Sequence, residues 1–91
     1  MFATDVPPQE VYCLQEAAVM HEVPAPILAA IRILEAGLPG QKERNTNGTF
    51  DVGVMQINDG VWAPELRKLG VDINLVQHDA CVGIHAGADV L

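Results

Sequence analysis

Residues 31–37 read Ile-Arg-Ile-Leu-Glu-Ala-Gly, and residues 53–58 read Gly-Val-Met-Gln-Ile-Asn. The first segment ends a stretch of apolar residues that would cover nearly every side of a helix. Pro26 is suited to begin this helix. Gly37 is a natural C-terminal stop, so the sequence predicts a helix over about residues 27–36. Because a helix without a polar face is usually the buried centre of a fold, we expect that position for this one.

Glu35 is the only carboxylate in this apolar helix, and it lies in the last turn. The helix dipole disfavours a carboxylate at the C-terminal end, and apolar neighbours disfavour its charge further. Both effects favour the protonated form that a general acid must carry, so Glu35 is the candidate catalytic residue. The alternative interpretation is a surface glutamate at a frayed helix end.

Apolar residues at helical spacing predict three further helices. They span about residues 9–22, 61–69 and 79–91, and residues 71–76 are predicted to be a connector with Asn74 as a cap. The residues expected to face inward are Val11, Leu14, Ala17 or Ala18, Met20, Val54, Met55, Ile57, Cys81, Val82, Ile84, Ala88 and Leu91.

Strand signals are confined to one place in the chain. Asn47-Gly48 is a strong turn signal, and it predicts a short hairpin that continues through residues 49–52. The predicted fold class is therefore mainly α, with at most a small β-turn or hairpin element. We expect residues 1–8 to form a flexible leader and residues 9–91 to form one domain.

The composition excludes several classes of partner. Of the 91 residues 49% are hydrophobic, and the formal net charge is −7. Nucleic acid and anionic membrane surfaces need clustered Lys and Arg, so neither is expected to bind. No apolar run reaches the roughly 18–20 residues that span a bilayer, and the N-terminus shows no secretory signal.

The cysteines and histidines give no site by spacing alone. Cys13 and Cys81 could be buried free thiols or one disulfide that closes most of the chain, and composition leaves both open. His21, His78 and His85 have no metal-ligand spacing with one another or with the cysteines, so no metal site is expected.

Three other chemistries are set aside. A calcium loop over residues 43–54 fails because Val54 stands where a bidentate glutamate is required. A nucleophilic pair of Cys81 with a nearby histidine is disfavoured by its expected helical position. Trp62 could stack on a sugar, but a lone tryptophan in a small helical domain is more often part of the core.

Residues 45–58 read N-T-N-G-T-F-D-V-G-V-M-Q-I-N. With Glu35, this segment resembles the lytic transglycosylase domains with a lysozyme-like fold of the goose-lysozyme type. In that family a glutamate ends an apolar helix, and a later loop carries N-x-N-G-T-[YF]-D-x-G-L-M-Q-I-N. The match is best with small secreted forms that accompany bacterial secretion, conjugation and pilus machines. The resemblance covers about residues 9–91, including Cys13 and the segment around Cys81.

This resemblance implies cleavage of the β-1,4 bond between N-acetylmuramic acid and N-acetylglucosamine in peptidoglycan. Glu35 would protonate the glycosidic oxygen and then take a proton from the 6-hydroxyl, which closes a 1,6-anhydro ring without any cofactor. Gln56 and Asn58 would hold the sugar, Met55 would wall the groove, and Gly53 would allow close approach of the backbone.

The resemblance also implies that Asp51 braces the loop through backbone hydrogen bonds and is not a second catalyst. It further implies a Cys13–Cys81 disulfide and an oxidising compartment, so we expect a periplasmic or secreted protein.

Two departures from the family pattern keep alternatives open. Ala36 stands where the family usually has serine, and the family normally continues beyond Leu91 with helices that close the groove. We therefore expect a domain that is truncated at the C-terminus. One alternative is a non-catalytic domain that binds glycan or partner proteins, and another is a hydrolytic muramidase. A homodimer is a separate hypothesis, motivated by the apolar final helix.

Overall fold

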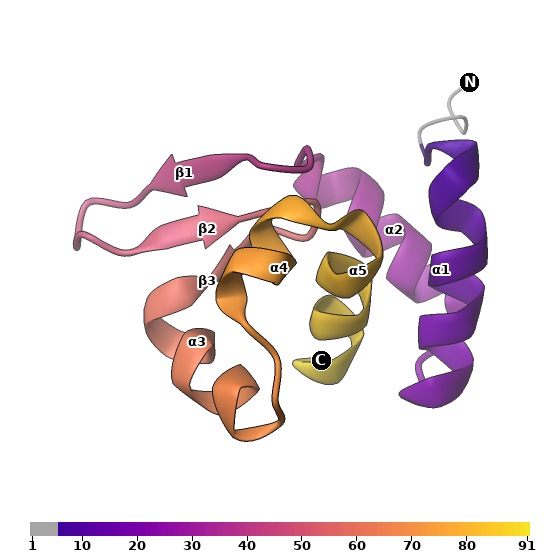
Figure 1. Ribbon diagram of the computed structural model, residues 1–91. Coiled ribbons are helices and arrows are strands. Elements are labelled where there is room, and N and C mark those ends of the chain that lie inside the picture. Colours follow the sequence, from indigo (N-terminus) through magenta and orange to yellow (C-terminus); the bar gives the residue numbers. More distant parts are fainter. Residues whose placement is uncertain (1–5) are drawn as a thin grey trace.

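The computed structural model of the chain describes residues 6–91, so most of the leader predicted over residues 1–8 lies outside the described residues. The elements in chain order are α1 (Pro8–Met20), α2 (Ala25–Glu35), β1 (Lys42–Arg44), β2 (Phe50–Val52), β3 (Ile57–Asn58), α3 (Asp59–Lys68), α4 (Ile73–His78) and α5 (Ala80–Asp89) (Figure 1). The predicted class, mainly α with a small hairpin, is confirmed.

The three strands form one antiparallel sheet in the order β1-β2-β3, which projects from one side of the helices (Figure 1). Lys42 pairs with Val52 in the hairpin, and Asp51 pairs with Asn58 on the other edge of β2. The hairpin turn contains Gly48, which has a φ of 89° that a glycine adopts without strain. The turn prediction is therefore correct, whereas the two-residue strand β3 was not predicted.

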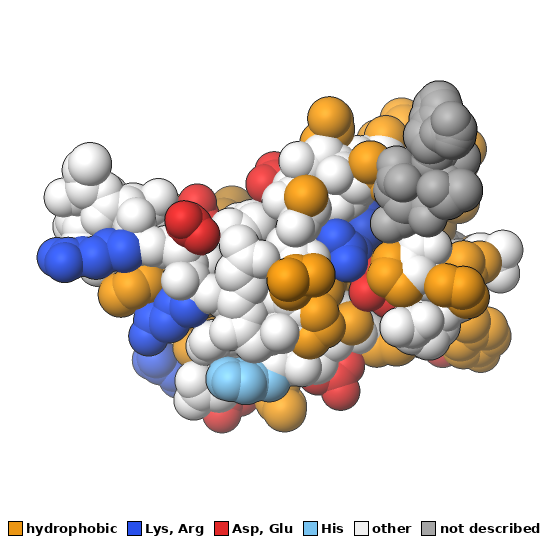
Figure 2. All heavy atoms as spheres, turned by 90° about the horizontal axis from the view of Figure 1, so that it is seen from above, with side chains coloured by type: hydrophobic (Ala, Val, Ile, Leu, Met, Phe, Trp, Pro, Cys, Tyr) orange, Lys and Arg blue, Asp and Glu red, His pale blue; other side chains and the backbone are white. Residues whose placement is uncertain are grey.

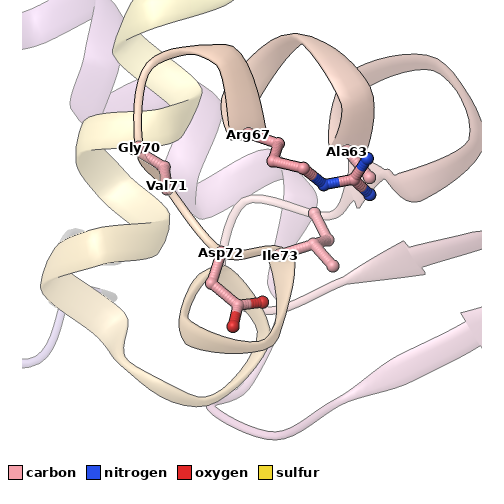
Figure 3. A pocket seen from close by; sticks show the side chains of 6 residues that line it. All are labelled: Ala63, Arg67, Gly70, Val71, Asp72 and Ile73. Carbon is pink, nitrogen blue, oxygen red and sulfur yellow. The ribbon is translucent and has the colours of Figure 1, made fainter.

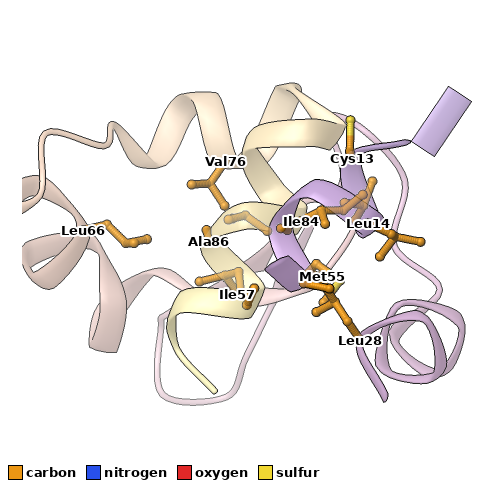
Figure 4. Packing of buried hydrophobic residues seen from close by; sticks show 14 residues of the cluster. Cys13, Leu14, Leu28, Met55, Ile57, Leu66, Val76, Ile84 and Ala86 are labelled. Carbon is orange, nitrogen blue, oxygen red and sulfur yellow. The ribbon is translucent and has the colours of Figure 1, made fainter. Parts of the chain in front are cut away.

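Helix α5, and not α2, is the buried centre of the fold. Its buried residues are Gly83, Ile84, Ala86, Gly87 and Ala88. Large apolar side chains from the other elements pack around it (Figure 4). Because five of its ten residues are Ala or Gly, the neighbouring elements can approach its backbone closely.

The prediction that the second helix is the buried centre is wrong. Only Leu28 and Arg32 of α2 are fully buried, and Leu34 is 82% exposed. Apolar character all round the helix indicated burial on every side, but the described chain packs against one stripe only.

The inward stripe of α1 was predicted only in part. Leu14, Ala17 and Ala18 are buried as expected, but Val11 and Met20 are exposed. The buried stripe instead begins at Glu10 and continues through Cys13. Apolar periodicity could not predict this start, because Glu10 is charged.

In the last third of the chain two predictions are wrong. Residues 71–76 are not a connector, because most of them belong to α4, and the Asp72 carboxylate caps this helix by accepting a bond from the Asn74 N–H (2.8 Å). Leu91 is exposed, whereas Ile84 and Ala88 are buried as expected. The final helix that motivated the homodimer hypothesis is thus covered by the chain's own elements.

The disulfide between Cys13 and Cys81 is present, which confirms this prediction. It joins α1 to α5 across 68 residues of sequence, with the two Cα atoms 5.4 Å apart. Within residues 6–91, no helix is long and apolar enough to cross a membrane.

We expect the paired replacement of Cys13 and Cys81 by alanine to lower the free energy of unfolding by about 2–4 kcal/mol, because the open chain regains loop entropy. Urea unfolding, followed by circular dichroism, measures the difference from the oxidised protein. An unchanged unfolding midpoint would show that the crosslink does not constrain the chain.

Candidate functional site

Glu35 is the last residue of α2, and its side chain is exposed. The helix ends because Ala36 adopts a left-handed conformation with a φ of 53°, and its N–H donates to the Arg32 carbonyl (3.1 Å). The expected stop at Gly37 is thus displaced by one residue. The burial of Glu35 among apolar neighbours, expected from the sequence, is not present in the described chain.

Gly37 has a different role, which links Glu35 to the second sequence segment. It is buried, and a Cβ at this position would collide with the Gly53 carbonyl group. The backbone that follows Glu35 therefore lies directly against the backbone of residues 53–54. This contact brings the two parts of the sequence pattern, which are separated by the hairpin, to the same place.

A buried ion pair lies next to this junction between the end of α2 and residues 53–54. The Arg32 guanidinium donates to both carboxylate oxygens of Glu10, at 2.6 and 3.2 Å. Its Nη1 atom also approaches the Val54 carbonyl oxygen (3.4 Å). The two side chains are 6% and 4% exposed, respectively. The pair joins α1 and α2 to the segment of residues 53–58, and the sequence interpretation missed it.

The segment of residues 53–58 is mostly part of the core. Gly53 is buried, and Met55 is 4% exposed with its side chain against Gly87 of α5. Val54 and Ile57 are buried as well. The proposed contacts of Met55 and Gly53 with a substrate stay predictions. In the described chain both residues are buried.

Gln56 and Asn58 are the half-buried residues of this segment, and Gln56 has an unusual backbone. It has a φ of 50°, a left-handed conformation that is uncommon for a residue other than glycine. Its side-chain amide donates to the Gly53 carbonyl oxygen (2.9 Å), which holds the strained turn closed. Gln56 therefore lies next to the Gly37–Gly53 contact, because it donates to the same Gly53 carbonyl oxygen.

Four polar residues of the loop form one hydrogen-bonded cluster. The Asn45 and Asn58 amides both donate to the Thr49 hydroxyl, at 3.1 and 3.0 Å. The same two amides donate to the Asp51 carboxylate, at 3.1 and 3.3 Å. Asp51 therefore braces the loop, through side chains and not through the backbone bonds that the sequence interpretation assumed.

Asn58 is also the N-cap of α3. Its side-chain oxygen accepts a bond from the Val61 N–H (3.0 Å), while its amide nitrogen is held by Thr49 and Asp51. Both polar atoms of Asn58 thus have partners within the loop. Its predicted contact with a sugar stays a prediction, and the structure gives it a local structural role.

We expect Asn58→Ala to lower the free energy of unfolding by about 1–2 kcal/mol, because α3 loses its cap and the cluster loses a donor. Asn58→Ser is the matched control: it retains a capping oxygen, so it should lose less. Thermal unfolding of the two variants measures the difference, and equal stability of Asn58→Ala and the parent protein would contradict the capping role.

The arrangement offers one free carboxyl group and not a pair. Glu35 is exposed at the end of α2, whereas Asp51 is engaged by two amides. No group of three or more His, Cys, Asp or Glu side chains within residues 6–91 is arranged to hold a metal ion. Within this arrangement, Glu35 is the carboxyl group that is exposed and able to act as an acid or a base.

Two cavities, each of about 370 Å³, lie elsewhere in the molecule. One lies beside the loop between α3 and α4 and is lined by Arg67 and Asp72, among others (Figure 3). The other is lined mainly by apolar side chains of α3 and α5 together with His21 and His85. Glu35, Gln56 and Asn58 line neither of them.

The chain matches no protein-family model. Over 80 residues, or 87% of its length, it is 31% identical to Invasion protein IagB of Salmonella typhimurium and of Salmonella typhi. It has the same identity over the same length to Protein IpgF of Shigella flexneri. The alignments cover 49% of IagB and 52% of IpgF, so the chain spans about half the length of these relatives.

Proposed function

We propose that the chain is a peptidoglycan lytic transglycosylase domain that cleaves the β-1,4 bond between N-acetylmuramic acid and N-acetylglucosamine and forms a 1,6-anhydro product. The observation that carries the proposal is the contact between Gly37 and Gly53. Glu35 ends α2 two residues before this contact, so the contact supports the proposal that Glu35 acts together with the segment of residues 53–58. The sequence pattern that resembles this enzyme family is thus assembled in space, and the similarity to IagB and IpgF extends over the same part of the chain.

In the proposed mechanism Glu35 acts twice. As a carboxylic acid it protonates the glycosidic oxygen, and the N-acetyl group of the substrate stabilises the positive charge that develops at the anomeric carbon. As a carboxylate it then accepts the proton of the 6-hydroxyl, whose oxygen attacks the anomeric carbon and closes the anhydro ring. A substrate-assisted route of this kind suits a site with a single free carboxyl group, whereas ordinary glycosidases need two.

Gln56 is the residue of the loop best placed to orient the sugar. One N–H of its amide is used by the Gly53 carbonyl, and among the described residues its amide oxygen has no hydrogen-bond donor. That oxygen is suited to accept a bond from an acetamido N–H or a hydroxyl group. The left-handed backbone of Gln56 fixes the direction of the side chain before any substrate binds.

The proposed compartment is the periplasm or the extracellular space. The disulfide supports this proposal, because such crosslinks persist mainly in oxidising compartments. The proposed role is local wall remodelling for a bacterial secretion machine, and the similar protein IagB is named an invasion protein. Contacts with proteins of such a machine, and a homodimer, remain part of the proposal.

Release of soluble fragments from purified peptidoglycan tests the proposal. We expect the untagged protein to release muropeptides over time, and the rate should scale with enzyme concentration. Absence of release by a protein that is folded by circular dichroism would remove the catalytic assignment.

A non-catalytic binding domain is the second candidate. The exposure of Ile27 and Leu34 on α2 favours it, because these two side chains offer an apolar surface to a partner. Co-sedimentation with insoluble peptidoglycan separates the two candidates: retention without fragment release would indicate binding alone.

A further inference from the structure

Two histidines, 64 residues apart in the sequence, meet on the side of the molecule formed by α1 and α5. The Nε2 atom of His21, which follows α1, lies 3.2 Å from the Nδ1 atom of His85 on α5. Each ring has a carboxylate at its other nitrogen. His85 Nε2 lies 2.9 Å from Glu16, and His21 Nδ1 lies 3.7 Å from Asp89.

The two inner nitrogens cannot face each other with their lone pairs alone. Glu16 lies 2.9 Å from His85 Nε2 and accepts its N–H, so the Nδ1 atom of a neutral His85 is an acceptor, whereas Asp89, 3.7 Å from His21 Nδ1, is beyond hydrogen-bond distance. In the neutral pair His21 Nε2 therefore donates its N–H to His85 Nδ1 across the 3.2 Å separation. A metal ion can replace this shared proton, because both inner nitrogens then offer it a lone pair.

We propose that His21 Nε2 and His85 Nδ1 form a binding site for a divalent transition-metal ion of the zinc or copper class. Bonds of about 2.0–2.1 Å from two nitrogens that are 3.2 Å apart would meet at roughly 100°, near the tetrahedral angle. The Glu16 carboxylate at His85 Nε2 matches the arrangement in which metal-binding histidines are usually held, and Asp89 adds a second negative charge near His21. Two protein ligands bind the ion, and water fills its other positions.

The surroundings of the pair favour a cation. Glu16 and Asp89 supply two negative charges, and no lysine or arginine of residues 6–91 forms an ion pair with them. On the face drawn in Figure 2, most of the visible Lys and Arg atoms lie at the hairpin end, and one further basic group lies near the middle of the view. His21, His85 and Asp89 also line the second cavity, so a bound ion would join the end of α1 to α5 at the edge of that cavity.

Isothermal titration of the untagged, chelator-treated protein with zinc chloride, and separately with copper chloride, tests the proposal. We expect one ion per chain for at least one of the two metals. Because the ion binds the folded chain, it should also raise the midpoint of thermal unfolding. His85→Gln should abolish binding, and Glu16→Gln should weaken it by about tenfold through the loss of the carboxylate that holds His85.

His78→Gln is the matched control, because His78 is exposed on α4 and lies outside this group. It should bind the metal as the parent protein does. The proposal is overturned if neither metal binds to the folded parent protein. It is equally overturned if His78→Gln, and not His85→Gln, loses the ion. Fragment release from peptidoglycan is a separate measurement, so failure of one proposal does not remove the other.

Discussion

Replacement of Glu35 by glutamine is expected to lower the rate of peptidoglycan cleavage by about 10²–10⁴-fold or below detection. The amide cannot donate the proton that the leaving oxygen needs, and it cannot accept the proton of the 6-hydroxyl afterwards. Because the Glu35 side chain is exposed at the end of α2, the same change should leave the unfolding midpoint within experimental error. The measurement is the initial rate of fragment release at equal concentrations of folded protein.

Glu65→Gln is the matched control for this experiment. Glu65 is an exposed glutamate on α3 whose only ion pair within the described chain is with Lys68 (3.5 Å). Its replacement alters the net charge by the same amount, so the two variants differ only in the position of the lost carboxylate. Equal rates for Glu35→Gln and Glu65→Gln would remove Glu35 from the mechanism.

Arg32→Met is expected to lower the free energy of unfolding by about 3–5 kcal/mol. It leaves the buried Glu10 carboxylate without its partner, and it frees the Val54 carbonyl at the junction of α2 with residues 53–58. A domain of this size has only about 5–15 kcal/mol of stability, so the loss removes a large part of it and should shift the unfolding midpoint clearly. Urea unfolding measures the loss.

The double variant Glu10→Leu with Arg32→Met separates the effect of the pair from that of either charge. Replacement of both partners by apolar residues removes the unpaired carboxylate, so the double variant should be more stable than Arg32→Met. If it is less stable than the single variant, the ion pair itself, and not the isolated charge, is the source of the stability.

The sequence predicted the positions of the elements well, and it predicted which helix is central poorly. Turn residues and apolar periodicity are local signals, and they located the hairpin and four of the five helices within a few residues. Which helix lies at the centre of the fold depends on how closely the backbones of the neighbouring elements can approach it. The Ala and Gly residues of α5 permit that approach, whereas the larger residues of α2 gave the stronger hydropathy signal.

The candidate site shows the same limit. Glu35 at the end of a helix was predictable from its neighbours, but the left-handed residue that stops the helix is Ala36, and Gly37 instead makes the contact with Gly53. The roles of Arg32 and of the two paired histidines depend on residues more than 20 positions away. Local spacing could not show them, although a lone arginine in an apolar helix is a signal of a buried partner.

The capping role of Asn58 could have been predicted from the local sequence. An asparagine directly before a helix is among the preferred capping residues, and the expected start of the helix at residue 61 concealed this role. A start at residue 59 would have identified Asn58 as the cap. The polar residues of the loop pattern would then have been interpreted first as residues that stabilise the loop through hydrogen bonds.

Mass spectrometry of the muropeptides released from purified peptidoglycan tests the central claim most directly. The protein and its Glu35→Gln variant are compared under identical conditions, with circular dichroism as the check on folding. We predict 1,6-anhydro-muropeptides, each lighter by one water than the reducing-end product, from the parent protein alone. Reducing-end products would contradict the transglycosylase mechanism and indicate a muramidase, and no products from the folded parent protein would contradict the proposed catalysis itself.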